Sequence, residues 1–168
     1  MVETVISIRT ARLGDEVDIA SVHDAAWREA YRGVIPGREL ERMIARRGPS
    51  WWRLAIARRT PLLVLEFGGS VVGYVSYGKN RVPALGYGGE IFELYLAPEC
   101  QGCGLGRRMF EAARKDLAGH GYGSIVVWAL AENERAIRFY RQLGGRIVRR
   151  AHETFGGQDR ERVAFGFG

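Results

Sequence analysis

Residues 101–106, with the sequence Gln-Gly-Cys-Gly-Leu-Gly, are the stretch that decides the fold of this chain. An apolar run that ends in Pro98 precedes them, and a helical pattern that begins at Arg107 follows them. Three glycines at alternate positions remove the Cβ atoms from a tight turn, so the backbone can approach another molecule closely. The N-terminus of the following helix offers unpaired N–H groups and the positive end of a dipole. The stretch therefore predicts an anion site, most naturally for a phosphate or pyrophosphate.

Two common glycine turns fit this stretch poorly. A nucleotide-triphosphatase loop needs Gly-Lys followed by Ser or Thr, whereas two arginines follow Gly106. A dinucleotide-binding turn needs G-x-G-x-x-G directly after a strand. Here the pattern is G-x-G-x-G, and residues 98–101 separate it from the apolar strand. Glu132, an acidic residue at a later strand end, is the one feature that still supports a dinucleotide site.

Two longer blocks place the turn in a wider pattern. Residues 90–106 form a strand, a proline and then Gln-x-x-Gly-x-Gly, and residues 131–144 contain Asn, Ala, a Phe-Tyr pair and Leu-Gly. Together they resemble the acetyl-CoA signature and the second block of the GNAT superfamily of N-acetyltransferases. Residues 26–36 are also similar to the first two helices of many bacterial members. One departure is Gly145, where many members have Phe, and this weakens a packing contact.

The order of predicted elements agrees with the fold that this resemblance implies. Apolar alternation and turn residues predict β-α-α-β-β-β-α-β-α-β-β, a mixed α/β sheet with helices on its faces. The GNAT fold implies a twisted mixed sheet of six to seven strands flanked by about four helices. The length of 168 residues suits one domain, residues 1–168. The predicted strands are 5–8, 62–67, 71–77, 90–96, 124–130, 146–149 and 162–167, and the clearest helices start at 14–15, near 40, at 107 and after Asn133.

The resemblance implies how acetyl-CoA, the expected cosubstrate, is bound. In the family, a splay between two parallel strands admits the thioester and the pantetheine arm, and strand backbone pairs with the pantetheine amides. The N–H groups of the turn and the helix start hold the pyrophosphate. Asn133 bonds the cofactor arm or caps a helix, and these two roles are compatible. The residues implied are Leu94, Tyr95, Leu96, Gln101, Gly102, Cys103, Gly104, Leu105, Gly106, Arg107 and Asn133.

Acyl transfer to an amine needs a base for the ammonium proton and an acid for the departing thiolate. An alkyl ammonium has a pKa near 10 and must lose its proton first. Glu90 and Glu93 lie on the strand beside the acetyl group, on opposite faces by alternation. Glu90 matches the usual acidic position of the family and is the favoured base, with Glu93 as the alternative. The resemblance makes Tyr140, in the Phe-Tyr pair, the general acid.

The predicted function is transfer of an acetyl group from acetyl-CoA directly to a primary amine, of a small molecule or a protein N-terminus. Trp27, Tyr31 and Arg32 lie where the first helices of the family wall the acceptor cleft, although core packing explains the two aromatic residues equally well. The rival is a non-catalytic domain on the same fold that senses acyl-CoA or binds a protein. A homodimer is possible by analogy with the family.

Composition sets the outer limits of these hypotheses. The chain is 46% hydrophobic and 26% charged, which is usual for globular proteins, and it has no apolar run long enough to cross a membrane. Residues 1–4 lack the start of a signal peptide, so a cytoplasmic location is expected. The net charge is +6, and among the basic residues only Lys79 and Lys115 are lysines. The arginines are scattered, so no nucleic-acid partner is predicted.

The cysteines and histidines give no strong metal or redox signal. Cys100 and Cys103 form a C-x-x-C, which can be a redox pair, but the second cysteine lies inside the glycine turn and no second pair exists for zinc. Cys103 is better interpreted as a turn residue. His23, His120 and His152 show no spacing typical of a triad or a metal site. No metal is expected.

Overall fold

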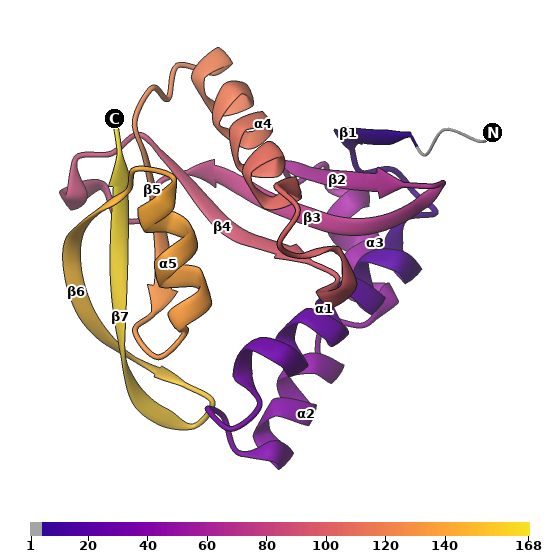
Figure 1. Cartoon of the computed structure of the whole chain (residues 1–168), viewed down its shortest axis with the longest axis horizontal. Helices are drawn as coiled ribbons and strands as arrows, with labels where there is room; N and C mark the ends of the chain where they lie inside the picture. The colour runs from indigo at the N-terminus through magenta and orange to yellow at the C-terminus, as the bar shows by residue number, and fades with distance from the viewer. Residues whose placement is uncertain (1–4) are drawn as a thin grey trace.

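A computed structural model describes residues 5–168, and its centre is a seven-stranded mixed sheet (Figure 1). The strand order is β1-β2-β3-β4-β5-β7-β6, and only the β4–β5 pair is parallel. The expectation about a signal peptide concerns residues 1–4, which lie outside the described residues. The strands are β1 (Ile6–Thr10), β2 (Leu62–Phe67), β3 (Ser70–Lys79), β4 (Gly89–Leu96), β5 (Ile125–Leu130), β6 (Arg146–Phe155) and β7 (Gln158–Phe167).

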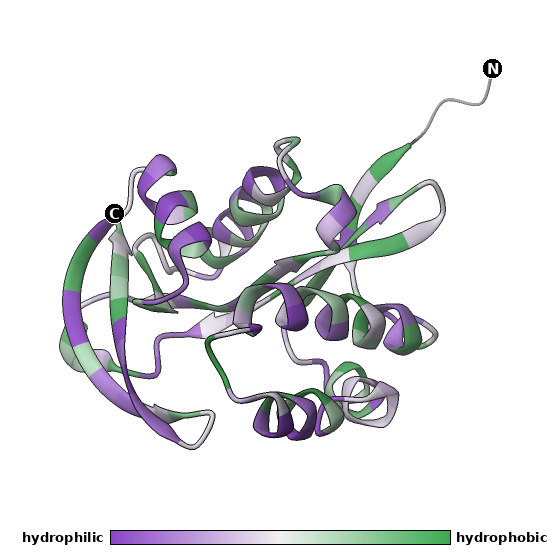
Figure 2. Ribbon diagram, turned by 60° about the horizontal axis from the view of Figure 1, so that its bottom comes forward, coloured by the Kyte–Doolittle hydropathy of each residue, from purple (hydrophilic) through white to green (hydrophobic). Residues whose placement is uncertain are grey.

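Five α-helices cover the two faces of this sheet (Figure 2). They are α1 (Glu16–Tyr31), α2 (Gly37–Ala45), α3 (Pro49–Ala57), α4 (Leu105–Gly119) and α5 (Glu134–Gln142). Helices α4 and α5 pack on one face, where Met109, Phe110 and Tyr140 join the largest apolar core. Helices α1 to α3 pack on the other face, where Ile19 and Trp52 lie in a second core. The prediction of a mixed α/β sheet with helices on its faces is confirmed.

Helix α3 is the element that the sequence pattern did not assign. Its nine residues begin at Pro49, which is favourable at the first helical position because proline has no N–H to leave unpaired. Trp52 is 1% exposed, whereas Trp51 on the same helix is exposed. Two adjacent tryptophans obscure the helical period, and this explains why five helices are found where about four were expected.

The C-terminal hairpin is longer than predicted. Strands β6 and β7 each have ten residues and meet at the Gly156-Gly157 turn, whereas the sequence predicted only residues 146–149 and 162–167 as strands. The added part of β6 is polar and largely exposed, so it lacks the apolar alternation that marks a strand. Pairing with β7 forms it, and Glu153 and Phe155 are thereby carried over the face of the sheet that α1 covers.

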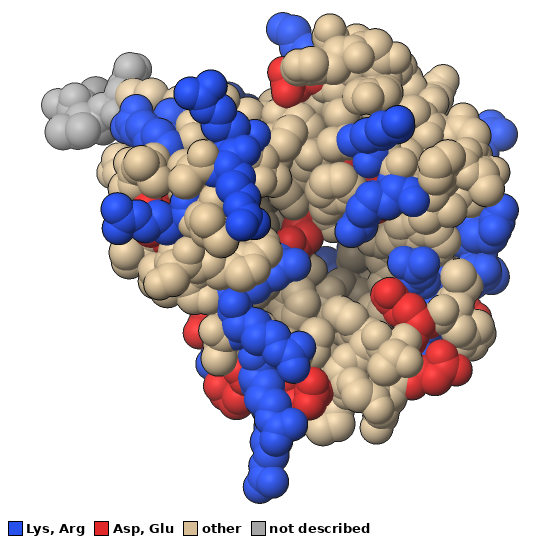
Figure 3. Space-filling model, turned by 180° about the vertical axis from the view of Figure 1, so that it is seen from behind, with Lys and Arg blue, Asp and Glu red and all other residues tan. Residues whose placement is uncertain are grey.

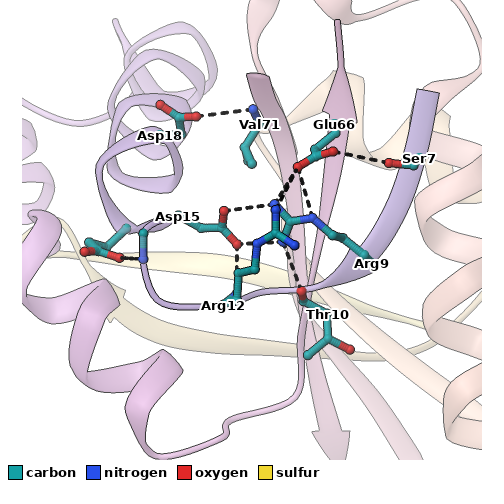
Figure 4. Close-up of polar contacts among 10 residues, drawn as sticks. Ser7, Arg9, Thr10, Arg12, Asp15, Asp18, Glu66 and Val71 are labelled. Carbon is teal, nitrogen blue, oxygen red and sulfur yellow. Dashed lines mark hydrogen bonds and ion pairs between the residues drawn. The ribbon is translucent and has the colours of Figure 1, made fainter. Parts of the chain in front are cut away.

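A polar cluster fixes the start of α1 against the first two strands (Figure 4). Arg9 of β1 donates to Asp15 at 2.8 and 3.0 Å and to Glu66 of β2 at 2.6 and 3.0 Å. Asp15 also accepts from the Arg12 N–H, and its hydrogen bond to Arg9 is the largest cause of its lowered pKa. The cluster sets where α1 begins and therefore where its aromatic residues, two to four turns later, reach the sheet.

Within residues 5–168, no helix is both long and apolar enough to cross a membrane.

Candidate active site

Strands β4 and β5 pair only at their N-terminal ends. The parallel pairing runs from Gly89 opposite Ile125 to Ile91 opposite Val127 and then stops, although both strands continue. Beyond this point β4 still pairs with β3, so the backbone groups of its free edge face the gap toward β5. A gap with exposed strand backbone on one side can accept an extended, amide-containing chain as an added strand. Leu94, Tyr95 and Leu96 lie on this edge.

A β-bulge in β4 changes which side chains share a face. Ser76 of β3 is opposite Glu93 and Tyr77 is opposite Ile91, so Phe92 is an extra residue. The alternation shifts there, because Ile91 and Leu94 pack in the same core although they are three residues apart. Glu90 and Glu93 consequently line one cavity on the other side of the sheet. The expectation that they lie on opposite faces is therefore wrong.

The three glycines of the turn serve two different purposes. Gly102 and Gly104 both have φ +82°, a left-handed conformation that favours glycine, and no atom lies within 4 Å of the positions their Cβ atoms would occupy. Gly106 is helical, and a Cβ there would lie 3.1 Å from the ring of Phe139. The first two keep an open turn, whereas the third permits close packing of α4 on α5.

The start of α4 presents an uncapped helix terminus to this turn. The helix begins at Leu105, two residues before the predicted start at Arg107, and Gly104 is its N-cap residue without a side-chain hydrogen bond. Its first turn contains no acidic residue. Uncapped N–H groups, the helix dipole and open space over Gly102 together fit a phosphate group. The residues present therefore fit the pyrophosphate of coenzyme A.

The side chains of Gln101 and Arg107 hold the turn in place through hydrogen bonds. Gln101 donates through Nε2 to the Leu96 carbonyl at 3.2 Å and accepts from Arg135 of α5. Arg107 donates to the Gln142 carbonyl at the end of α5, at 3.4 Å. Both contacts connect the end of β4 and the start of α4 to α5. In this structure Gln101 thus supports the turn through its side chain.

Asn133 and two tyrosines gather at the splay. The Asn133 side chain accepts from the Ala136 N–H at 3.3 Å, which confirms the helix cap. The hydroxyls of Tyr31 and Tyr95 lie 3.0 Å apart. Burial raises the pKa of Tyr31, and hydrogen bonds with Tyr95 and Asn133 partly oppose that rise. The cap is thus confirmed, whereas a bond from Asn133 to the cofactor arm stays a prediction.

Tyr140 lies on the opposite side of the sheet from the cavity, in the core that α4 and α5 form. Its ring packs against Phe110 and Phe165, and burial raises the pKa of its hydroxyl well above the usual value. It therefore keeps its proton at neutral pH. Gly145, next to this residue, is needed because a Cβ there would lie 2.6 Å from the ring of Phe167. The sequence predicted a weakened packing contact at Gly145. In the structure the ring of Phe167 occupies the space beside this glycine.

Glu90 is buried in an ion pair. Its side chain is 1% exposed, and Arg81 contacts both carboxylate oxygens, through its backbone N–H at 2.9 Å and its guanidinium at 2.8 and 3.3 Å. The guanidinium of Arg81 also lies over the ring of Phe92, 4.4 Å from its centre. Burial and this ion pair leave little of the carboxylate open to the cavity.

Glu93 is more exposed than Glu90 and is the last member of a chain of hydrogen bonds that includes Tyr74 and His23. Its side chain is 16% exposed; it pairs with Arg47 and accepts from the Tyr74 hydroxyl at 3.5 Å. The Tyr74 oxygen lies 2.9 Å from Nδ1 of His23, which is fully buried. Burial lowers the pKa of His23 to about 3, so its ring is neutral. Since Tyr74 has one proton, donation to Glu93 requires His23 Nδ1–H to donate to Tyr74.

These carboxylates line a cavity of about 700 Å³ between the sheet, α1, α3 and the β6–β7 hairpin. Figure 3 shows a hollow on this side of the molecule, with Lys and Arg side chains along both of its sides. Trp27 and Tyr31 line it and are also well buried, so core packing and a place in the cavity wall are compatible for both residues. Arg32 is exposed and is not among its lining residues.

Comparison with known proteins places this arrangement in a family. A family model described as "Acetyltransferase (GNAT) family" matches residues 19–145. The chain belongs to the GNAT acetyltransferase family. Members are acyltransferases, and the family resemblance of the sequence is thereby confirmed. The match includes the strand, glycine turn and second block from which the resemblance was recognised.

Several N-acetyltransferases resemble this GNAT chain. It is 32% identical over 136 residues to the uncharacterized N-acetyltransferase YuaI of Bacillus subtilis, which covers 81% of this chain and 78% of that protein. It is 33% identical over 87 residues to mycothiol acetyltransferase of Arthrobacter, covering 49% of this chain and 26% of that protein. The PaiA N-acetyltransferase of Thermoplasma acidophilum, solved with coenzyme A, superposes with a TM-score of 0.77 at 19% identity, covering 95% and 98% of the two chains.

The sequence did not reveal the arginines that face the carboxylates of this GNAT site. Arg47 follows α2, and Arg81 lies in the loop after β3. Tyr74 and His23, the remaining members of the Glu93 chain, come from β3 and α1. Alternation along β3 could have placed Tyr74 and Ser76 on one face. Nothing in the sequence could pair Tyr74 with Glu93, 19 residues away, or with His23, 51 residues away.

Cys100 and Cys103 are free thiols, and Cys103 donates to the Cys100 carbonyl at 3.2 Å. Burial is the main cause that raises the pKa of Cys100, which disfavours a reactive thiolate. His120 and His152 are exposed. Among residues 5–168, no cluster of three His, Cys, Asp or Glu side chains could hold a metal ion.

Proposed function

We propose that this protein transfers an acetyl group from acetyl-CoA directly to the primary amine of an acceptor that enters the cavity. The observation that supports the proposal best is the position of the splay. It connects the open glycine turn at the end of β4 with the carboxylate-lined cavity at the bulge of the same strand. A thioester arm along the free edge of β4 would bring its acetyl group to the cavity floor.

The proposed reaction forms one bond and breaks one. The neutral amine attacks the acetyl carbonyl carbon, and an amide C–N bond forms as the thioester C–S bond breaks. Before the attack, a carboxylate takes the proton of the ammonium form, directly or through water. The leaving thiolate takes a proton from Tyr140, and the second proton, which the nitrogen loses as the amide forms, passes through water and restores the Tyr140 hydroxyl. Tyr140 suits this role because burial keeps its hydroxyl protonated. N–H groups of the free β4 edge would stabilise the developing oxyanion.

The geometry supports Glu93 as the base better than Glu90. Both oxygens of Glu90 are occupied by Arg81, and its side chain is almost fully buried. Both oxygens of Glu93 are hydrogen-bonded as well, one by Arg47 and the other by Tyr74, but its side chain is 16% exposed and is therefore open to an amine or a water in the cavity. Glu90 then holds Arg81 over Phe92 at the edge of the splay. This reverses the preference of the sequence, which favoured Glu90.

Matched amide substitutions test both the activity and the choice of base. We expect Glu93→Gln to lower kcat for acetyl transfer by roughly 10²–10⁴-fold with little change in the KM for acetyl-CoA. Glu90→Gln should change kcat far less, although it weakens the contact with Arg81. Release of free thiol from acetyl-CoA over a panel of amines measures both. An equal or larger loss for Glu90→Gln would reverse the assignment.

Tight binding of coenzyme A with no turnover on any amine would instead favour the rival, a non-catalytic acyl-CoA sensor. A cytoplasmic location, a homodimer and a single domain over residues 1–168 stay predictions of the sequence.

A further inference from the structure

Eight aromatic side chains from distant elements line the cavity. They come from α1, α3, β4, β5 and β6, so no single helix or strand accounts for them. An acetyl group alone needs a small fraction of about 700 Å³, which is a volume typical of a pocket for a whole small molecule. The rings are Trp27, Tyr31, Trp51, Trp52, Phe92, Tyr95, Trp128 and Phe155.

Every carboxylate that lines the cavity is paired with an arginine that also lines it. The pairs are Glu90 with Arg81, Glu93 with Arg47 and, at 3.5 Å, Glu153 with Arg162. The cavity therefore carries no excess negative charge. A polyamine or other polycation would have to displace arginines to find a counter-ion, so the charge balance favours an acceptor with one amine.

Each of these arginines is stacked on an aromatic ring. Arg162 lies 4.0 Å from the ring centre of Trp128, Arg81 lies 4.4 Å from that of Phe92, and Arg47 lies 4.5 Å from that of Trp51. A guanidinium is planar and stacks on flat groups. Planar surfaces thus dominate the wall, and they give most contact to a ligand that is itself planar.

Two of these stacks stand at the mouth of the splay. Phe92 follows Ile91 on β4 and Trp128 follows Val127 on β5, and Ile91–Val127 is the last pair before the strands separate. Both rings line the cavity, beside Glu93. An acceptor body held between these two strands would carry its amine to the place where the acetyl group enters.

We propose that the acceptor is a small monoamine with a flat aromatic body, held against Phe92 and Trp128 with its amine beside Glu93. The inference rests on the proposed acetyl transfer and adds the substrate class and two specificity-determining residues. Aliphatic amines of equal size lack a flat face. The additional ammonium groups of a polyamine would find no unpaired carboxylate in the cavity wall.

Two amines of nearly equal size and amine chemistry test this proposal. We expect kcat/KM for 2-phenylethylamine to exceed that for 2-cyclohexylethylamine by about tenfold or more, since only the first is flat and aromatic. Spermidine and a short peptide with a free N-terminus should be poorer still. Trp128→Leu and, separately, Phe92→Leu should reduce the aromatic preference toward one while leaving the KM for acetyl-CoA unchanged. Phe67→Leu, an exposed site on β2, is the control.

The outcomes separate the two proposals. If amines are acetylated but the two ring compounds react equally, or spermidine or the peptide is best, the acceptor class is overturned and acetyl transfer stands. An aromatic preference that survives in both Leu variants, each shown by circular dichroism to be folded, overturns the role of the two rings. If no amine is acetylated, both proposals fail.

Discussion

The donor side and the acceptor side of this site are built in different ways. On the donor side, one contiguous stretch from the end of β4 to the start of α4 offers mainly backbone groups, and its key residues are glycines. On the acceptor side, side chains from eight helices and strands converge, and ion pairs and rings form much of the surface. A backbone site needs little from distant residues, whereas a side-chain site depends on the whole fold. The two sides should therefore respond differently to substitution.

The largest expected effect is at Tyr140, the proposed proton donor to the leaving thiolate. Tyr140→Phe removes the proposed proton donor and keeps the ring that packs on Phe110, so kcat should fall by roughly 10²–10⁴-fold while the KM for acetyl-CoA changes little. Tyr122→Phe, which alters a tyrosine outside the site, is the control. Steady-state thiol release measures both, and undiminished turnover in Tyr140→Phe would remove the general-acid assignment.

The same difference explains what could be predicted from the sequence. The glycine turn, the Asn133 cap and the core of α4 follow from local spacing, and the structure has them within two residues of the predicted positions. The bulge at Phe92 could not be predicted, because a single inserted residue depends on how β3 and β4 register. It moved Glu93 to the same face as Glu90.

Two further elements of the acceptor side, α3 and the outer half of β6, could not be predicted from the sequence for a related reason. Two adjacent tryptophans obscured the helical pattern of α3. The outer half of β6 forms a strand only through its pairing with β7. Both elements wall the cavity, through Trp51 and Phe155 among others. Their contribution depends on tertiary contacts, which no local period reports.

A second prediction uses pH, because the acceptor side contains a buried titratable group. The pKa of His23 is lowered to about 3 from an ordinary value of 6.5. Above pH 6.5 the ring is neutral in both folded and unfolded states. Below that pH only the unfolded state takes up the proton, so the free energy of unfolding falls by about 1.4 kcal/mol per pH unit until about pH 3.

Urea unfolding at pH 7 and pH 4.5 checks this effect. Between these two values, His23→Asn should lose about 2–3 kcal/mol less stability than the natural protein, because it lacks the group that titrates. His120→Asn, which removes an exposed histidine, should keep the pH dependence of the natural protein. Identical pH dependence in all three proteins would show that burial of His23 does not hold its pKa down.

A third prediction compares two glycines of the same conformation. Gly104 has φ +82° and Gly157 has φ +77°, and neither has an atom within 4 Å of its Cβ position. Alanine at either position should cost about 1 kcal/mol of stability through backbone strain. Only Gly104→Ala should also raise the KM for acetyl-CoA, by roughly tenfold, since it disturbs the N–H groups at the start of α4. Equal KM values would mean that the turn does not hold the cosubstrate.

The smallest effect should come from a side chain on the donor side, Cys103. Its thiol is exposed and donates only to the Cys100 carbonyl, so a backbone-built site should not depend on it. We expect Cys103→Ser to leave the KM for acetyl-CoA within about twofold of the natural value, and a reducing agent to change neither protein, because a serine hydroxyl makes the same hydrogen bond. Steady-state kinetics with and without dithiothreitol measure this. The contrary result is that the natural protein gains activity on reduction while Cys103→Ser does not. This would establish a redox role for the two cysteines, and a side chain would then be part of the donor side.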